Sequence, residues 1–130
     1  MAYQTDHETV VRDWGYFQVL ACIPQLKFKK LVLMPGKATS LQYHHHRSEF
    51  WTVLSGVGEA FIDGTMHQLF ADKTLWVDPG VVHQLQNTGS DSLVIHEVQQ
   101  GDYLEEDDIV RLSGLGADAQ LPPNACKTRT

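Results

Sequence analysis

The sequence has few cysteines, no excess of basic residues and no long hydrophobic run. Its two cysteines, Cys22 and Cys126, form no C-x-x-C pair, so we expect reduced thiols in a cytoplasmic protein. Lysine and arginine total 10 against 16 acidic residues, and the net charge of −6 disfavours nucleic acid and anionic membranes as partners. No run approaches the roughly 20 apolar residues of a transmembrane helix, and residues 1–8 show no secretory signal.

Sustained helical periodicity is also missing before Gly101. Short segments rich in β-branched, aromatic and aliphatic residues recur instead about every 8 to 12 residues, with Gly, Pro, Asn or Asp between them, which is typical of an all-β sandwich or barrel. The expected strands cover residues 18–23, 27–34, 40–46, 50–54, 58–64, 66–70, 74–77, 83–86 and 93–99. A chain of 130 residues is the size of one domain.

The two ends of the chain are expected to lie outside that domain. We predict an N-terminal extension over residues 1–11, a β domain over 12–112 and a mobile tail over 113–130. Residues 103–112 fit either a short helix or an acidic loop, because the acidic residues 105–108 favour a helix N-terminus. In both cases residues 105–108 are expected to form a solvated acidic face.

Histidine is the one unusual component, with seven residues of which three are adjacent. On an extended strand Gln42, His44 and His46 share one face, and Glu49 follows after a short turn. A sheet that folds back brings His83 opposite His44. Two imidazoles, a carboxylate and an amide oxygen then converge, and such a set suits one divalent ion of Zn, Mn, Fe, Co or Ni.

The spacing of these residues resembles the cupin family. The first cupin motif, G-x5-H-x-H-x4-E-x6-G, is matched by Gly36, His44, Glu49 and Gly56, with Gln42 in place of the first histidine. The resemblance implies a single cupin domain with a double-stranded β-helix (jelly-roll) fold. Small cupins are often homodimers, so it also implies a homodimer.

The second cupin motif, G-x5-P-x-G-x2-H-x3-N, is matched at Gly80, His83 and Asn87. It departs from the pattern at Asp72 and Asp78, where the family has Gly and Pro. Both motifs together cover about fifty residues of the chain.

The run from Ser40 to Trp51 narrows the resemblance, because it is similar to the S-L-Q-x-H-H-H-R-x-E-x-W signature of type II mannose-6-phosphate isomerases. In that family this cupin is usually the C-terminal domain of a bifunctional enzyme that also carries a mannose-1-phosphate guanylyltransferase, and the present sequence resembles a stand-alone copy. The resemblance implies that Gln42, His44, Glu49 and His83 bind the metal. It also implies isomerisation of a sugar phosphate, with mannose 6-phosphate and fructose 6-phosphate as the pair.

Two other functions stay open. The D-x-Y-G-R ending of the family is replaced after Arg111 by Leu112-Ser113-Gly114, which favours a non-catalytic cupin that binds a sugar or sugar nucleotide. An iron-dependent dioxygenase is the third alternative, and Gln42 argues against it because such cupins usually carry a third histidine there.

Catalytic candidates follow from the same segments. The planar guanidinium of Arg47 suits a phosphate, and its alternative is a surface ion pair with Glu49. Glu97 lies in an apolar strand, where burial raises the pKa of a carboxyl group toward that of a useful base; its alternative is a salt bridge. His46 is a second candidate for the base. Strand alternation directs one of the two neighbouring lysines, Lys29 and Lys30, outward. Either lysine is a possible phosphate ligand.

Overall fold

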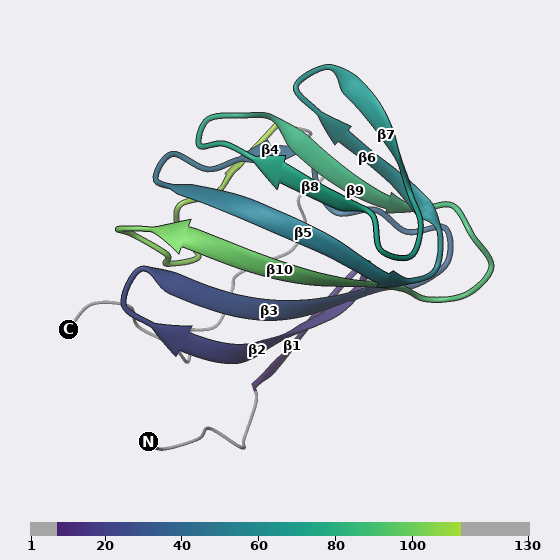
Figure 1. Cartoon of the computed structure of the whole chain (residues 1–130), viewed down its shortest axis with the longest axis horizontal. Coiled ribbons are helices and arrows are strands. Elements are labelled where there is room, and N and C mark those ends of the chain that lie inside the picture. Colours follow the sequence, from purple (N-terminus) through teal and green to yellow (C-terminus); the bar gives the residue numbers. More distant parts are fainter. Residues whose placement is uncertain (1–7, 113–130) are drawn as a thin grey trace.

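Two antiparallel sheets make up the fold, seen in a computed structural model that describes residues 8–112 (Figure 1). The six-stranded sheet has the order β1-β2-β3-β10-β5-β8 and the five-stranded sheet the order β11-β4-β9-β6-β7. This arrangement confirms the all-β jelly-roll prediction. The strands are β1 (Thr9–Arg12), β2 (Gly15–Ile23), β3 (Leu26–Leu33), β4 (Gln42–Tyr43), β5 (Arg47–Ser55), β6 (Gly58–Ile62), β7 (Thr65–Leu69), β8 (Thr74–Val77), β9 (His83–Asn87), β10 (Leu93–Gly101) and β11 (Val110–Arg111).

Most strands fall where the sequence pattern predicts them. The β6–β7 hairpin turns at Asp63 and Gly64, whose φ angles of 51° and 84° are the positive pair that a two-residue type I′ turn requires. β1 begins at Thr9, so the sheet extends three residues beyond the expected start of the domain at residue 12. The tail over residues 113–130 lies outside the described residues.

The inward face of the large sheet changes from apolar to polar along its central strands. At one end Leu33, Leu93 and Val53 are buried in the hydrophobic core. Toward the other end the inward positions carry Lys27 and Lys29 on β3, Glu97 and Gln99 on β10 and Glu49 on β5. The strand register sets Lys29 opposite Glu97, and Lys27 opposite Gln99, which in turn faces Glu49. The sheet therefore builds a buried polar end between the two layers.

The segment after β10 is an acidic loop, and the alternative of a short helix is wrong. Residues 8–112 contain no helix, and so no helix able to cross a membrane. The prediction of a solvated acidic face is wrong for Glu106 and Asp108, whereas Asp107 is exposed. Glu106 accepts a hydrogen bond from Lys29 Nζ at 2.6 Å, and Asp108, which is 5% exposed, accepts two from the backbone. These carboxylates bind buried donors because the loop crosses the polar end of the large sheet.

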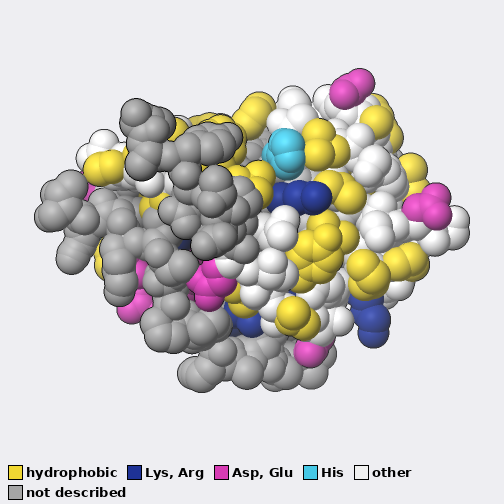
Figure 2. All heavy atoms as spheres, turned by 90° about the horizontal axis from the view of Figure 1, so that it is seen from below, with side chains coloured by type: hydrophobic (Ala, Val, Ile, Leu, Met, Phe, Trp, Pro, Cys, Tyr) yellow, Lys and Arg dark blue, Asp and Glu magenta, His cyan; other side chains and the backbone are white. Residues whose placement is uncertain are grey.

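A row of apolar side chains lies on the opposite, outer face of the large sheet. Phe28, Val98, Phe50 and Trp76 are register partners across four neighbouring strands, β3, β10, β5 and β8. Phe28, Phe50 and Trp76 are all exposed. Figure 2, which views the molecule from below relative to Figure 1, also shows hydrophobic side chains at the surface between isolated charged groups.

Cys22 departs from the expected reduced state. It lies near the end of β2, is half-buried, and is disulfide-bonded. The prediction of reduced thiols is therefore wrong for this residue, whose position close to the surface leaves it accessible to a second sulfur. Cys126 lies outside the described residues.

Candidate metal centre

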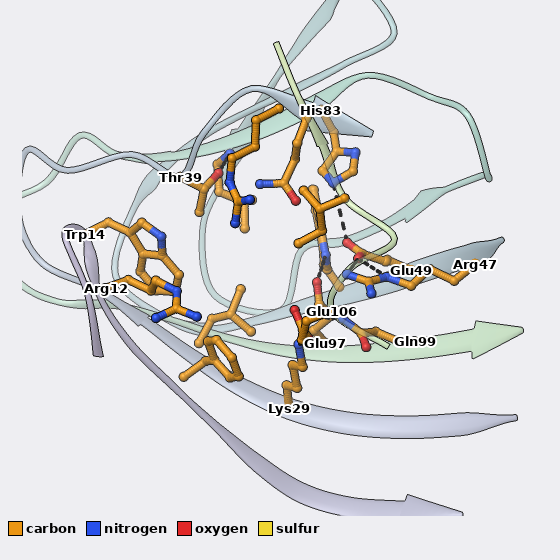
Figure 3. A pocket seen from close by; sticks show the side chains of 17 residues that line it. Arg12, Trp14, Lys29, Thr39, Arg47, Glu49, His83, Glu97, Gln99 and Glu106 are labelled. Atoms are coloured by element: carbon orange, nitrogen blue, oxygen red, sulfur yellow. Dashed lines mark hydrogen bonds and ion pairs between the residues drawn. The ribbon is translucent and has the colours of Figure 1, made fainter. Parts of the chain in front are cut away.

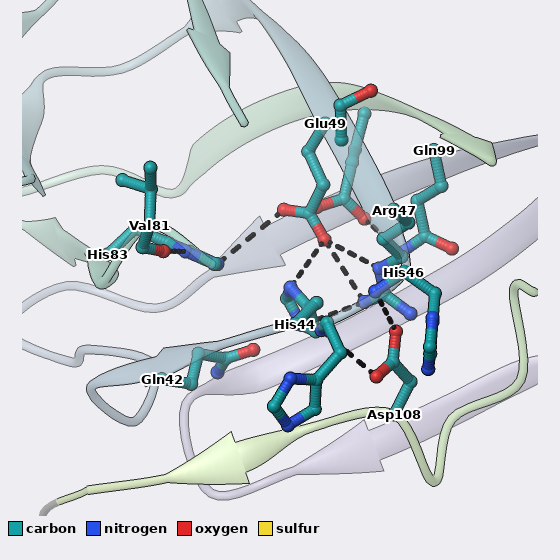
Figure 4. Close-up of polar contacts among 12 residues, drawn as sticks. Gln42, His44, His46, Arg47, Glu49, Val81, His83, Gln99 and Asp108 are labelled. Carbon is teal, nitrogen blue, oxygen red and sulfur yellow. Dashed lines mark hydrogen bonds and ion pairs between the residues drawn. The ribbon is translucent and has the colours of Figure 1, made fainter. Parts of the chain in front are cut away.

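Three predicted ligands, His44, Glu49 and His83, converge between the two sheets (Figure 4). All three are buried, and one ligand atom from each lies within 4.8 Å of the others. Glu49 is central: its Oε2 is 3.5 Å from His44 Nδ1, and its Oε1 is 3.7 Å from His83 Nε2. The structure thus brings together side chains that are up to 39 positions apart in the sequence.

Backbone contacts hold the two histidines in place. The Gly80 N–H donates to the His44 carbonyl oxygen at 2.7 Å and joins the two histidine segments. The His83 ring lies with Nδ1 2.9 Å from the Val81 carbonyl oxygen. Because a carbonyl can only accept, Nδ1 carries a proton, and Nε2 is the ring nitrogen that faces Glu49. Such a contact on the second ring nitrogen is what orients metal-binding histidines.

Gln42 lies beside this cluster on β4. It pairs with His83 of β9 in the strand register, and Figure 4 shows its amide on the same side as His44. The amide nitrogen donates to Ser40, to Oγ at 2.9 Å and to the carbonyl oxygen at 3.2 Å. These hydrogen bonds identify which atom of the Gln42 amide is the nitrogen. The amide oxygen is then the atom that remains to bind a metal. Ligation by Gln42 stays a prediction.

The protonation states of the cluster suit a cation. Burial lowers the pKa of His44 to about 3, so its ring is neutral, which is the form that binds metals. Burial opposes ionisation of Glu49, but the neighbouring His44 and Arg47 hold its pKa well below the usual range. A buried carboxylate with two histidine side chains is a donor set for a divalent transition metal. The residues present therefore fit the ion that the sequence motifs predict.

Arg47 lies against the cluster and contacts two of its members. Its Nε and Nη2 are both 3.0 Å from Glu49 Oε2, and Nη2 is also 3.0 Å from His44 Nε2. The ion pair with Glu49 is thus present, but it is buried rather than on the surface. Nη1 of Arg47 is buried without a hydrogen-bond partner among residues 8–112, so this NH₂ group remains for a ligand in the pocket.

Glu97 lies in the same pocket, next to Glu49. Its carboxyl oxygens accept hydrogen bonds from two neutral donors, Trp51 Nε1 at 3.1 Å and Gln99 Nε2 at 3.0 Å. Burial, and after it the negative charge of Glu49, raises the pKa of Glu97 to about 8. The sequence-based expectation of a buried carboxyl with a raised pKa is met.

His46 does not join the other candidates. It is exposed, its N–H donates to Asp108 Oδ2 at 2.9 Å, and its ring centre is 5.7 Å from that of Tyr103. Extended structure was expected over residues 40–46, but β4 ends at Tyr43 and the chain bends before β5. The alternation that sets His46 on the face of His44 is therefore lost.

The pocket beside the cluster contains charged residues that sequence reasoning did not select (Figure 3). Arg12, Arg111 and Glu106 line it together with Lys29, which is 4% exposed and points inward. The inward position of Lys27 and Lys29 was predictable from the sequence, because strand alternation puts both on the face of Leu31 and Leu33. Burial lowers the pKa of Lys27 to about 8.

Comparison with solved structures supports the fold. The CapF capsular polysaccharide assembling protein of Staphylococcus aureus matches with a TM-score of 0.71 at 18% identity, over 84% of this chain and 35% of that one. A Cupin 2 conserved barrel domain protein of Salinispora arenicola matches with a TM-score of 0.58 at 24% identity, over 65% of this chain and 73% of that one. The fold is that of the cupins.

Sequence comparison identifies the family. A mannose-1-phosphate guanylyltransferase of Klebsiella pneumoniae is 36% identical over 106 residues, which are 82% of this chain and 22% of that protein. The chain thus spans about one fifth of the length of such relatives. The family described as "Mannose-6-phosphate isomerase C-terminal" matches residues 2–114. The chain belongs to the mannose-6-phosphate isomerase C-terminal family of cupin domains.

Proposed function

We propose that this domain is a metal-dependent aldose–ketose isomerase that interconverts mannose 6-phosphate and fructose 6-phosphate. The observation that carries the proposal is the buried His44–Glu49–His83 cluster, which adjoins a pocket containing the carboxyl group of Glu97 and several cationic side chains. The family to which the chain belongs supports the same choice of reaction. The cytoplasmic location stays a prediction.

We assign the metal to His44, Glu49 and His83, with the amide oxygen of Gln42 as a further ligand. A divalent ion held there would act as a Lewis acid toward the carbonyl and hydroxyl oxygens at C1 and C2 of the sugar. Arg47 orients Glu49 and His44 through its hydrogen bonds. Its buried Nη1 is directed to an oxygen of the substrate in this proposal.

Glu97 is proposed as the group that moves the proton. It lines the pocket, lies next to Glu49 and is held by neutral donors, so its carboxylate is not neutralised by a direct ion pair. For the aldose, Glu97 takes the proton from C2 while O1 gains a proton, which gives a cis-enediol. Glu97 then returns its proton to C1 as O2 loses one and becomes the ketone oxygen.

A coupled assay tests this function. Protein stripped of metal is refilled separately with Zn²⁺, Mn²⁺, Co²⁺ and Fe²⁺, and conversion of mannose 6-phosphate is followed. We expect at least one metal to restore turnover, and His83→Ala to abolish it together with stoichiometric metal binding. Glu97→Gln is expected to keep the metal and lose turnover, because the amide cannot accept the C2 proton.

A non-catalytic sugar-binding cupin gives a different result in the same assay. It binds metal and sugar phosphate but shows no turnover with any of the four ions. A dioxygenase consumes oxygen, so an oxygen electrode distinguishes it from both. The isomerase proposal fails if metal is bound at one ion per chain and no metal restores turnover.

A further inference from the structure

Glu97, the group proposed to move the proton, is held by two side chains that the metal cluster does not use. Trp51 Nε1 donates to Glu97 Oε2 at 3.1 Å, and Gln99 Nε2 donates to Glu97 Oε1 at 3.0 Å. Both donors line the pocket, and neither is more than 1% exposed. Figure 3 shows Gln99 next to Glu97 in that pocket. Because each oxygen has its own donor, both the position and the plane of the carboxyl group are restrained.

The strand register brings both donors to Glu97. Trp51 on β5 is the register partner of Glu97 on β10, and Gln99 follows Glu97 by two positions on the same face of β10. Side chains directly opposite each other on paired antiparallel strands lie about 5 Å apart at Cβ. The contacts are thus set by two adjacent central strands of the large sheet, and sites built on strands hold their geometry more precisely than sites on loops.

A cation lies opposite Glu97 but binds another carboxylate. Lys29 on β3 is the second register partner of Glu97, yet its Nζ lies 2.6 Å from Glu106 Oε2. The indole and the amide that hold Glu97 are neutral. Neutral donors hold a carboxylate in place without cancelling its charge, which suits a group that takes up a proton and returns it.

Stability alone does not account for a glutamine at position 99. Gln99 is fully buried, and its Oε1 has no hydrogen-bond partner in the described part of the chain. A buried polar atom without a partner lowers the free energy of unfolding, and an apolar side chain of similar size avoids that loss. The amide nitrogen, which donates to Glu97, is therefore the part of this side chain that needs a functional explanation.

Trp51 contacts the metal cluster as well as Glu97. Its ring meets the His83 ring edge-on, with the ring centres 5.6 Å apart and an angle of 64° between the planes. The same side chain thus touches the proposed base and a proposed metal ligand. Trp51 thereby restrains the position of Glu97 relative to His83.

We propose that Trp51 and Gln99 are positioning residues that hold the carboxyl group of Glu97 in line with C1 and C2 of the sugar phosphate. This inference rests on the proposed function and adds to it how the base is directed. Both residues act through Glu97. Because a misplacement of about 1 Å can lower a rate on the order of a hundredfold, loss of either donor is expected to lower kcat and to leave KM nearly unchanged.

Steady-state kinetics with mannose 6-phosphate tests this role in protein loaded with the metal that gives the highest turnover. Trp51→Phe removes the indole N–H and keeps an aromatic ring beside His83. Gln99→Met keeps the length of the side chain and removes the amide. We expect each variant to lower kcat at least tenfold, with KM and metal content within about twofold of the wild type.

Two control variants remove the same kinds of hydrogen bond at exposed positions outside the pocket lining. Trp76→Phe removes the bond from Trp76 Nε1 to Asp78 at 2.6 Å, and Gln68→Met removes the bond from Gln68 Nε2 to Glu59 at 3.1 Å. Both controls are expected to keep the wild-type kcat. Equal losses of kcat in the controls and in the pocket variants would refute the positioning role.

Proton–nitrogen NMR of the zinc-loaded protein tests the same contacts without turnover. The chain has three tryptophans, and the indole N–H signal that is missing from Trp51→Phe belongs to Trp51. Gln99→Met and Glu97→Gln are expected to shift this signal, because both disturb the carboxyl group that accepts its hydrogen bond. Gln68→Met is expected to leave it in place.

The outcomes separate this role from the isomerase reaction. The role is refuted if folded, metal-loaded Trp51→Phe and Gln99→Met keep the wild-type kcat, or if the Trp51 signal stays in place in both Gln99→Met and Glu97→Gln. Where Trp51→Phe unfolds early or loses metal, Gln99→Met decides the kinetic test. If the wild type shows no turnover with any metal, the isomerase proposal fails, and the NMR shift then decides whether Trp51 and Gln99 hold Glu97.

Discussion

Replacing Asp108 with asparagine removes a charge that holds the histidine segment in place. The Asp108 carboxylate accepts hydrogen bonds from the backbone N–H groups of His45 at 3.0 Å and His46 at 2.9 Å, directly after the proposed metal ligand His44. Asparagine keeps one acceptor oxygen and turns an NH₂ group toward the other N–H donor. The change therefore loses at least one charge-assisted hydrogen bond inside a buried site.

The loss is expected to lower the free energy of unfolding by about 2 kcal/mol, since a hydrogen bond to a charged group contributes roughly 1.5–3 kcal/mol. For a domain of this size that corresponds to a drop in Tm of about 8 °C. Because the same bonds orient the segment that carries His44, we also expect zinc affinity to fall by about tenfold.

Thermal unfolding and zinc titration measure these two effects, with Asp102→Asn as the matched control. Asp102 is exposed, and its hydrogen bond from Gln25 at 3.2 Å can be kept by the asparagine oxygen. The control is expected to stay within about 0.5 kcal/mol of the wild type. Equal Tm and equal zinc affinity for Asp108→Asn and Asp102→Asn would refute the role given to Asp108.

Three further predictions concern other parts of the molecule. The pKa of Glu106 is lowered from 4.5 to about 2, because Lys29 and Arg47 outweigh the opposing effect of burial. The ionised Glu106 carboxylate therefore contributes fully to the free energy of unfolding above pH 4.5, and this contribution is lost as the pH falls toward 2. Glu106→Gln is expected to flatten that part of the stability curve measured by urea unfolding, and an unchanged curve would contradict the pairing with Lys29. Gly56→Ala is expected to cost about 2 kcal/mol or more, because φ is 91° and a Cβ would lie 2.5 Å from the Ser92 carbonyl oxygen; a variant with the wild-type Tm would show that reasoning to be wrong. The predicted homodimer is tested by light scattering. If the exposed apolar row is the interface, Trp76→Glu is expected to give monomers. A dimer that persists in this variant would exclude the row as the interface.

The convergence of the three proposed metal ligands was predictable, because cupin motif spacing relates residues on strands that the sequence alone does not pair. His44, Glu49 and His83 came from that spacing, and the cluster confirms their convergence. The prediction for His46 fails because strand alternation ends at Tyr43, where the chain leaves β4. Alternation holds only while the backbone stays extended.

The rest of the pocket was harder to predict, because its residues come from distant segments. Arg12 and Arg111 are 99 positions apart and meet only through the sheet topology. Glu106 and Asp108 belong to an acidic run whose composition is typical of a solvated loop. Their burial depends on Lys29 and on two backbone N–H groups that only the folded chain presents.

The central claim is that the buried cluster and its pocket isomerise a sugar phosphate, and proton NMR of mannose 6-phosphate with the zinc-loaded domain in D₂O tests it most directly. The account predicts that fructose 6-phosphate appears until equilibrium is reached and that deuterium enters C1 of the product when Glu97 exchanges its proton with solvent. The Glu97→Gln variant, carrying the same zinc, is expected to leave the spectrum of mannose 6-phosphate unchanged. An unchanged spectrum with fully zinc-loaded wild-type protein, or product formed equally by Glu97→Gln, would contradict the account.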